Sequence, residues 1–93
     1  MTKTKAVNYN DEAYDVLIDR RTKWGNPFII GRDGDRTEVI DKYRQWIRVN
    51  KELKGMLHEL KGKRLGCCCK PKACHGDVLV EMVEAQEMME MFE

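Results

Sequence analysis

Residues Leu65–Leu79, with the sequence LGCCCKPKACHGDVL, predict a strand, a loop and the start of a helix in immediate succession. Leu65–Cys69 is short and apolar, which predicts a buried strand that ends before Pro71. A last helix is predicted from about Gly76 to Phe92, with apolar residues at helical spacing. In α/β proteins, loops at the carboxyl ends of strands commonly bind ligands. This stretch therefore predicts the last strand, the last helix and a candidate site between them.

Two further strands are predicted before this stretch. Lys5–Tyr9 contains a small apolar patch, and Tyr14–Ile18 places apolar side chains on one face with a period of two. Asn10 and Asp11 between them give a turn signal. The segment Pro27–Ile30 is also predicted to be extended.

Two helices are predicted between these strands and the cysteine-rich stretch. Asp35 and Glu38 resemble a capping box, and apolar residues follow at helical spacing. A second helix is predicted over Asn50–Leu60, with Gly62 as its stop. The order of elements predicts a single α/β (α+β) domain over residues 1–93, with a small mixed β-sheet covered by about three helices.

Composition excludes several classes of protein. The 93 residues include 17 basic and 16 acidic residues, and the net charge of +1 argues against strong non-specific nucleic-acid binding. No apolar run approaches the ~20 residues of a membrane span, and the N-terminus lacks the apolar core of a signal peptide. We therefore expect a cytoplasmic protein without membrane contact, in the host cytoplasm if a phage encodes it. Its four cysteines should be reduced there.

The clustered cysteines predict a metal site. Cys67 and Cys69 lie on one side of an extended strand, and with Cys74 and His75 they make a ligand set for one tetrahedral zinc ion. The alternative is that Cys67 and Cys69 are small buried hydrophobic residues.

The start of the last helix predicts an anion site. Its free backbone amides and positive end attract phosphate or carboxylate, and Gly76 permits close approach of the backbone. The same field should lower the pKa of Cys74 and make it a better nucleophile, with His75 or Asp77 handling protons. The catalytic candidates are therefore Cys74, His75 and Asp77. The alternative is that Asp77 only caps its helix.

A basic and aromatic segment, residues 20–28, is a third candidate. Arg21 and Lys23 suit phosphate, Trp24 can stack on a base, and Asn26 can read polar edges. The alternative places Trp24 and Phe28 in the core, with the cations in solvent. With Arg32 and the helix start included, the candidate ligand-binding residues are Arg21, Lys23, Trp24, Asn26, Arg32, Gly76 and Asp77.

Four elements also occur together along the chain: Arg21 with Lys23-Trp24-Gly25-Asn26-Pro27-Phe28, Gly31-Arg32-Asp33-Gly34, Tyr43 with Trp46, and Cys67-x-Cys69-x-Pro71-x-x-Cys74-His75-Gly76-Asp77-Val78-Leu79. Their joint pattern resembles domain-of-unknown-function family 4326, over about residues 5–84. The resemblance implies a shared fold and site, in small domains of bacteria and their phages, and no settled activity. Residues 85–93 form a helical tail outside it.

The leading functional hypothesis is binding of a small, phosphorylated, nucleotide-like ligand, such as a nucleotide signal that a phage scavenges. One alternative is a zinc-stabilised module that contacts protein or nucleic acid. Another is a nucleotide-processing enzyme that uses Cys74 and His75. The last helix is also predicted to pair with its counterpart in a homodimer, because it carries more apolar residues than one buried stripe needs: Met82, Val83, Met88, Met89, Met91 and Phe92.

Overall fold

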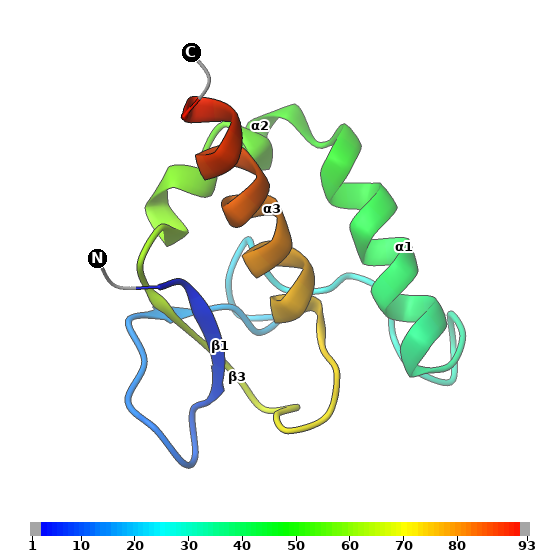
Figure 1. The fold of residues 1–93 in the computed structure, drawn as a ribbon. Helices are drawn as coiled ribbons and strands as arrows, with labels where there is room; N and C mark the ends of the chain where they lie inside the picture. Colours follow the sequence, from blue (N-terminus) through cyan, green and yellow to red (C-terminus); the bar gives the residue numbers. More distant parts are fainter. Residues whose placement is uncertain (1–2, 92–93) are drawn as a thin grey trace.

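The computed structural model describes residues 3–91 of the chain (Figure 1). Its sheet has three strands in the order β1-β3-β2, where β1 is Lys5–Asn8, β2 is Val16–Leu17 and β3 is Arg64–Cys67. Both pairings are parallel. The predicted α/β class with a small sheet and three helices is confirmed, but the sheet is parallel rather than mixed. Each connection brings the chain back to the same end of the sheet before the next strand begins.

The strands are shorter than the sequence pattern predicts. Only Val16 and Leu17 of the predicted Tyr14–Ile18 strand pair with β3. β3 ends at Cys67, so Cys68 and Cys69 already belong to the following loop. Pro27–Ile30 is not a strand, since the backbone turns there instead of pairing with the sheet.

The first predicted helix is confirmed as α1, Arg36–Val49. The Asp35 side chain accepts a hydrogen bond from the Glu38 backbone nitrogen, and the Glu38 carboxylate accepts one from the Asp35 nitrogen. Helical spacing buries one face of α1, formed by Val39, Tyr43 and Ile47.

The second predicted helix is divided in two. α2 is Lys51–Lys54, and the 3₁₀ helix η1 is Leu57–Leu60. Gly55, a poor helix former, lies at the break. The final helix is α3, His75–Glu90, preceded by Cys74 as its N-cap. Phe92 of the predicted final helix lies outside the described residues.

α3 packs against α1, β1 and η1, so the helices surround one core (Figure 1). Trp24 and Tyr43 are the largest fully buried side chains, and the Tyr43 hydroxyl donates a hydrogen bond of 2.8 Å to the Trp24 carbonyl. This packing leaves the first residues of α1 and α3 close to the carboxyl ends of β2 and β3, where one pocket joins them.

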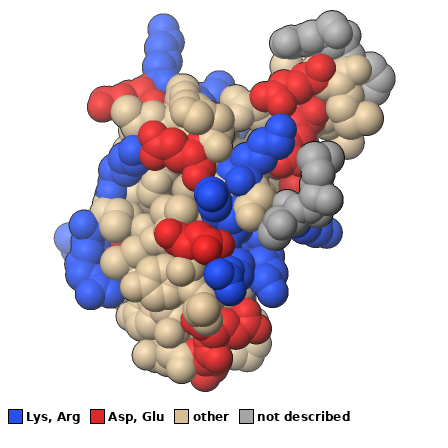
Figure 2. All heavy atoms as spheres, turned by 90° about the vertical axis from the view of Figure 1, so that its left-hand side faces the viewer, with Lys and Arg blue, Asp and Glu red and all other residues tan. Residues whose placement is uncertain are grey.

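On the face that Figure 2 shows, basic and acidic side chains lie next to one another between uncharged areas. The ion pairs of the molecule include Lys61 with Glu90 and Arg64 with Asp15. Among residues 3–91, no helix has the length and apolar character that crossing a membrane requires.

Candidate functional site

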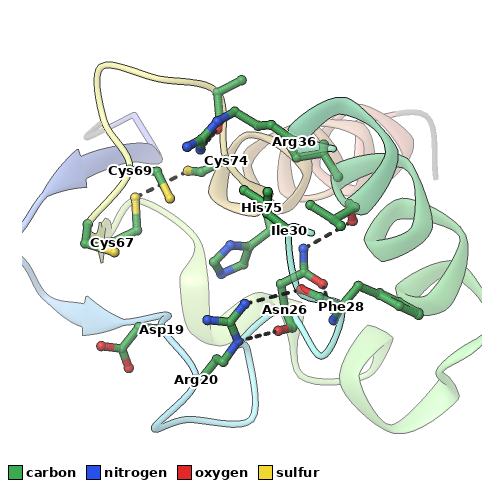
Figure 3. Close-up of a pocket in the computed structure, with 14 residues that line it drawn as sticks. Asp19, Arg20, Asn26, Phe28, Ile30, Arg36, Cys67, Cys69, Cys74 and His75 are labelled. Atoms are coloured by element: carbon green, nitrogen blue, oxygen red, sulfur yellow. Dashed lines mark hydrogen bonds between the residues drawn. The ribbon is translucent and has the colours of Figure 1, made fainter. Parts of the chain in front are cut away.

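A small pocket of about 100 Å³ opens where β2 and β3 end and where α1 and α3 begin (Figure 3). One wall is apolar and is formed by Phe28, Ile30, Val39 and Ile40. The other lining residues carry most of the chemistry: Asp19, Arg20, Asn26, Arg36, Cys67, Cys68, Cys69, Ala73, Cys74 and His75. The pocket is smaller than the ~300–1,000 Å³ of a site for a drug-sized ligand, so it fits one group of a larger molecule.

Two of the four cysteines meet inside this pocket. Cys67 is the last residue of β3 and Cys74 is the N-cap of α3, and their sulfur atoms are 3.3 Å apart. The hydrogen bond from the Cys74 thiol lowers the pKa of Cys67 to about 6, helped by the backbone amides of Cys69 and Lys70. Of the two sulfurs, Cys67 is therefore the one that ionises first, with Cys74 as the hydrogen-bond donor.

The prediction that the helix field lowers the pKa of Cys74 is wrong. The hydrogen bond with Cys67 and burial both raise the pKa of Cys74. Two sulfurs at this distance cannot both be ionised easily, and Cys67 takes the charge. Cys74 is also only 2% exposed. The arrangement does not favour Cys74 as an attacking nucleophile.

His75 is held in one orientation. Its Nε2 lies 2.6 Å from the Ile18 carbonyl oxygen, and because a carbonyl only accepts, Nε2 carries the proton. The Tyr43 ring packs against the imidazole edge at 5.0 Å. Burial lowers the pKa of His75, so the ring is neutral at pH 7. Within residues 3–91 Nδ1 has no hydrogen-bond partner, so it is the ring nitrogen left to accept a hydrogen bond.

The cations of the pocket are Arg20 and Arg36. Arg20 donates to the carbonyl oxygens of Asn26 and Phe28, at 3.2 and 3.3 Å. Arg36 donates to the Ala73 carbonyl at 3.0 Å. Burial raises the pKa of Cys69, and the charge of Arg36 acts against this larger effect. In Figure 3 the two guanidinium groups lie on opposite sides of His75. They are the groups that can meet an anion at this pocket.

Asn26 lines the pocket as predicted, but its side chain is hydrogen-bonded within the protein. Its amide nitrogen donates to the Val39 carbonyl at 3.1 Å, and its oxygen accepts from the Phe28 backbone nitrogen at 2.9 Å. Asn26 therefore fixes the loop to α1, and only its second N–H and second oxygen lone pair remain for a ligand.

The other predicted cations lie outside the pocket. Arg21 pairs with Asp19 at 2.7 Å, Lys23 with Glu59 at 2.9 Å, and Arg32 with Asp33 at 2.9 Å. Trp24, predicted to stack on a base, is only 2% exposed and belongs to the core. Its buried ring leaves no open face for a ligand, which corrects that prediction.

At the start of α3, the predicted ligand-binding carboxylate of Asp77 is hydrogen-bonded and ion-paired within the protein. The Asp77 carboxylate accepts a hydrogen bond from the Cys74 backbone nitrogen at 3.1 Å and forms an ion pair with Lys70. Gly76 is needed for packing, because a Cβ there would lie 2.9 Å from Ile18 Cδ1 and 3.1 Å from Ala6 Cβ. Neither Asp77 nor Gly76 lines the pocket.

The predicted zinc ligands Cys67, Cys69, Cys74 and His75 all line one pocket. A tetrahedral zinc ion with Zn–S bonds of ~2.3 Å needs sulfurs roughly 3.8 Å apart, near the observed 3.3 Å between Cys67 and Cys74. Nevertheless, no group of three or more His, Cys, Asp or Glu side chains within residues 3–91 has a geometry that holds a metal ion. The fit is therefore confined to two thiols, and a zinc site would require Cys69 and His75 to move.

Sequence reasoning missed Arg20 and Arg36. Arg20 follows the end of β2 within three residues, so the rule that ligands bind at the carboxyl ends of strands selects it. Arg36 is the first residue of α1, and it comes near Cys69 only through tertiary packing. Its position in the sequence gives no comparable signal.

Comparison with known proteins confirms the family resemblance. The DUF4326 family, described as a domain of unknown function, matches residues 1–85. An "Uncharacterized 12.4 kDa protein in nrdA-td intergenic region" of enterobacteria phage T4 is 39% identical over 84 residues, covering 85% of this chain and 76% of the phage protein. The "Uncharacterized protein R718" of Acanthamoeba polyphaga mimivirus is 35% identical over 74 residues, covering 71% of this chain but only 56% of that protein. No solved structure matches at a significant level.

Proposed function

Because the chain belongs to the DUF4326 family, whose description states no activity, we propose its function from its own pocket: binding of a small phosphorylated, nucleotide-like ligand. The observation that carries the proposal is the placement of Arg20 and Arg36 around one apolar-walled pocket at the carboxyl edge of a parallel sheet. Guanidinium groups bind phosphate through charge-assisted hydrogen bonds, and this edge is where α/β proteins bind ligands.

The two kinds of wall suggest how the ligand is held. The phosphate lies between the guanidinium groups, and an uncharged ring packs on Phe28 and Ile30, of which Ile30 is 50% exposed. His75 Nδ1 accepts a hydrogen bond from a ligand hydroxyl or amine, because its pKa is lowered and the ring is neutral. The rest of the ligand extends out of the pocket, since about 100 Å³ holds only one group.

A thermal-shift screen tests the proposal. The panel contains nucleoside mono-, di- and triphosphates, ADP-ribose and the matching unphosphorylated nucleosides. We expect at least one phosphorylated compound to raise Tm, and its nucleoside to raise it less. No shift with any compound, for a protein that melts cooperatively, contradicts the proposal. If the protein scavenges a nucleotide signal in the cytoplasm, for example in a phage-infected host, the ligand recovered after binding and release should be chemically unchanged.

A zinc-stabilised module that contacts protein or nucleic acid is the second candidate. What favours it is the convergence of Cys67 and Cys74 in a pocket that Cys69 and His75 also line. Elemental analysis of the purified protein tests it: one zinc per chain, with unfolding by a chelator, is the expected result. A metal-free protein that remains folded contradicts it.

We also propose that the chain forms a homodimer through α3. Met88, Met89 and Met91 are 62%, 69% and 81% exposed near the end of that helix. Met89 also lines a groove beside α1. The basic residues that line this groove are Arg44, Arg48 and Lys54. α3 carries exposed Glu84 and Glu90 and half-buried Glu87, so its acidic, Met-rich end complements the same groove of a second copy.

Light scattering at tens of micromolar protein tests the homodimer. We expect the mass of a dimer, and a monomer after truncation at Glu87. A monomer mass for the whole chain, or an unchanged dimer after truncation, contradicts the proposal.

A further inference from the structure

Cys67 and Cys74 form a buried pair of thiols to which the proposed ligand contacts assign no role. Their sulfurs are 3.3 Å apart, and the two residues are 1% and 2% exposed. Each is fixed by a regular element, because Cys67 ends β3 and Cys74 precedes α3. The other two cysteines differ: Cys68 is exposed and Cys69 is half-buried in the loop.

The two sulfurs can reach bonding distance by a small movement. A disulfide requires ~2.05 Å between sulfurs, so the pair must close by roughly 1.3 Å. Residues 68–73 between them form neither helix nor strand. A loop without regular hydrogen bonding can absorb such a shift while β3 and α3 keep their pairing and packing.

A small oxidant can reach this pair although it is buried. Both cysteines line the pocket of about 100 Å³, which has room for several water-sized molecules. Hydrogen peroxide is of that size class, whereas larger disulfides such as oxidised glutathione are not. The pocket therefore selects a peroxide over a bulky thiol oxidant.

We propose that Cys67 and Cys74 are a redox-active dithiol site that hydrogen peroxide converts into an intramolecular disulfide. The Cys67 sulfur attacks one peroxide oxygen, the O–O bond breaks, and the products are a sulfenic acid and water. The Cys74 sulfur then attacks the sulfenic sulfur and expels its oxygen as a second water. Two thiols lose two electrons and two protons, and one peroxide is reduced to two waters.

The test uses a chain in which these are the only cysteines. The double variant Cys68→Ser/Cys69→Ser removes the exposed and half-buried thiols and leaves the buried pair. After peroxide treatment we expect both remaining thiols to be lost together, with a monomer two hydrogen atoms lighter. Dithiothreitol should restore both thiols. The matched control adds Cys67→Ser to the same background, and it should never give the lighter monomer.

A second measurement uses the unaltered chain, so its result does not depend on whether the variants fold. Trypsin cuts after Lys72 but not between Lys70 and Pro71, so Cys67 and Cys74 fall in different peptides. The oxidised protein should yield these two peptides joined, with fragmentation placing the link at Cys67 rather than at Cys68 or Cys69 of the same peptide, and the reduced protein should yield them separate. The proposal is overturned if peroxide leaves the buried thiols free, oxidises them to sulfinic acid without a link, or links only separate chains.

Discussion

The segments Cys67–Asp77 and Arg20–Phe28 approach the same pocket, but they are held in place in different ways. The first begins at the end of β3 and ends in the first turn of α3, so regular elements position Cys67, Cys74 and His75 on either side of the loop 68–73. The second has no regular structure and is fixed by buried anchors: the Trp24 ring in the core and the Asn26 amide bonded to α1. A local cluster of basic and aromatic residues therefore indicates a loop near the site, while the anchors decide which of its side chains face the pocket.

We expect the largest effect on stability from a substitution that removes the buried Trp24 ring, which anchors the second segment. Trp24→Ala should lower the free energy of unfolding by about 3–5 kcal/mol, because it leaves a large cavity in the core. Urea unfolding measures this change. Phe28→Ala in the same segment is the control, and it should cost much less, because Phe28 is only half-buried at the pocket. A small stability loss for Trp24→Ala combined with lost ligand binding would instead restore Trp24 as a stacking residue.

The next prediction separates the cations that line the pocket from those that do not. Arg36→Gln should weaken binding of the best phosphorylated compound by roughly 10- to 100-fold, because a charge-assisted hydrogen bond is lost. Arg20→Gln should act in the same direction. Isothermal titration calorimetry measures the affinities, with Lys23→Gln as the control from the same segment and Arg48→Gln as the control from the same helix. Equal losses for Lys23→Gln would place the phosphate at the Glu59 side of the molecule.

Much of the fold can be predicted from residues that lie close to one another in the sequence. Helical spacing after Asp35 and the Asp35–Glu38 capping box predict α1 correctly, and the strand followed by a helix is correct for β3 and α3. Strand direction is not a local property. β3 lies between β1 and β2, and the connections that place it there are long. The apolar pattern of a short strand does not indicate whether the neighbouring strand is parallel or antiparallel.

The residues of the candidate site are also of two kinds: some are close together in the sequence, and others reach the pocket only through tertiary packing. Cys67, Cys69, Cys74 and His75 are close in sequence, and the structure brings all four to one pocket. Arg36 reaches the pocket only because α1 packs against α3, so a contact far along the chain decides its role. The direction of the pKa shift at Cys74 also depends on such a contact. The helix field is local, but the sulfur of Cys67 at 3.3 Å outweighs it.

A third prediction tests how tightly the first segment is fixed. Gly76→Ala should cost about 1–3 kcal/mol of stability, because the new Cβ would lie 2.9 Å from Ile18 Cδ1 and 3.2 Å from the Cys74 sulfur. Gly55→Ala is the matched control. Its Cβ would lie no closer than 3.5 Å to a neighbour and its φ of −67° suits alanine, so it should be neutral or slightly stabilising. Equal costs for both variants would mean that α3 does not pack on the sheet as closely as the structure shows.

The smallest expected effect concerns the opposite end of the sheet, where Asp15 and Arg64 join the starts of β2 and β3. The Arg64 guanidinium and backbone nitrogen donate to the Asp15 carboxylate at 2.9–3.1 Å and lower the pKa of Asp15 to about 2. A pKa lower in the folded state than in the unfolded state means that the pair stabilises above about pH 4 and loses this contribution as pH falls towards 2. Both side chains are more than a third exposed, so solvent screening keeps the effect small.

Thermal melts between pH 7 and pH 2 measure this contribution as the difference in Tm between the unaltered chain and Asp15→Asn. The difference should be largest at pH 7 and should shrink below pH 4. Ligand affinity should be the same for Asp15→Asn and the unaltered chain, because Asp15 lies at the amino end of β2 and the pocket lies at its carboxyl end. A Tm difference that grows at low pH would show that Arg64 does not stabilise the charged form of Asp15. A loss of affinity in Asp15→Asn would show that the two ends of the sheet are not independent.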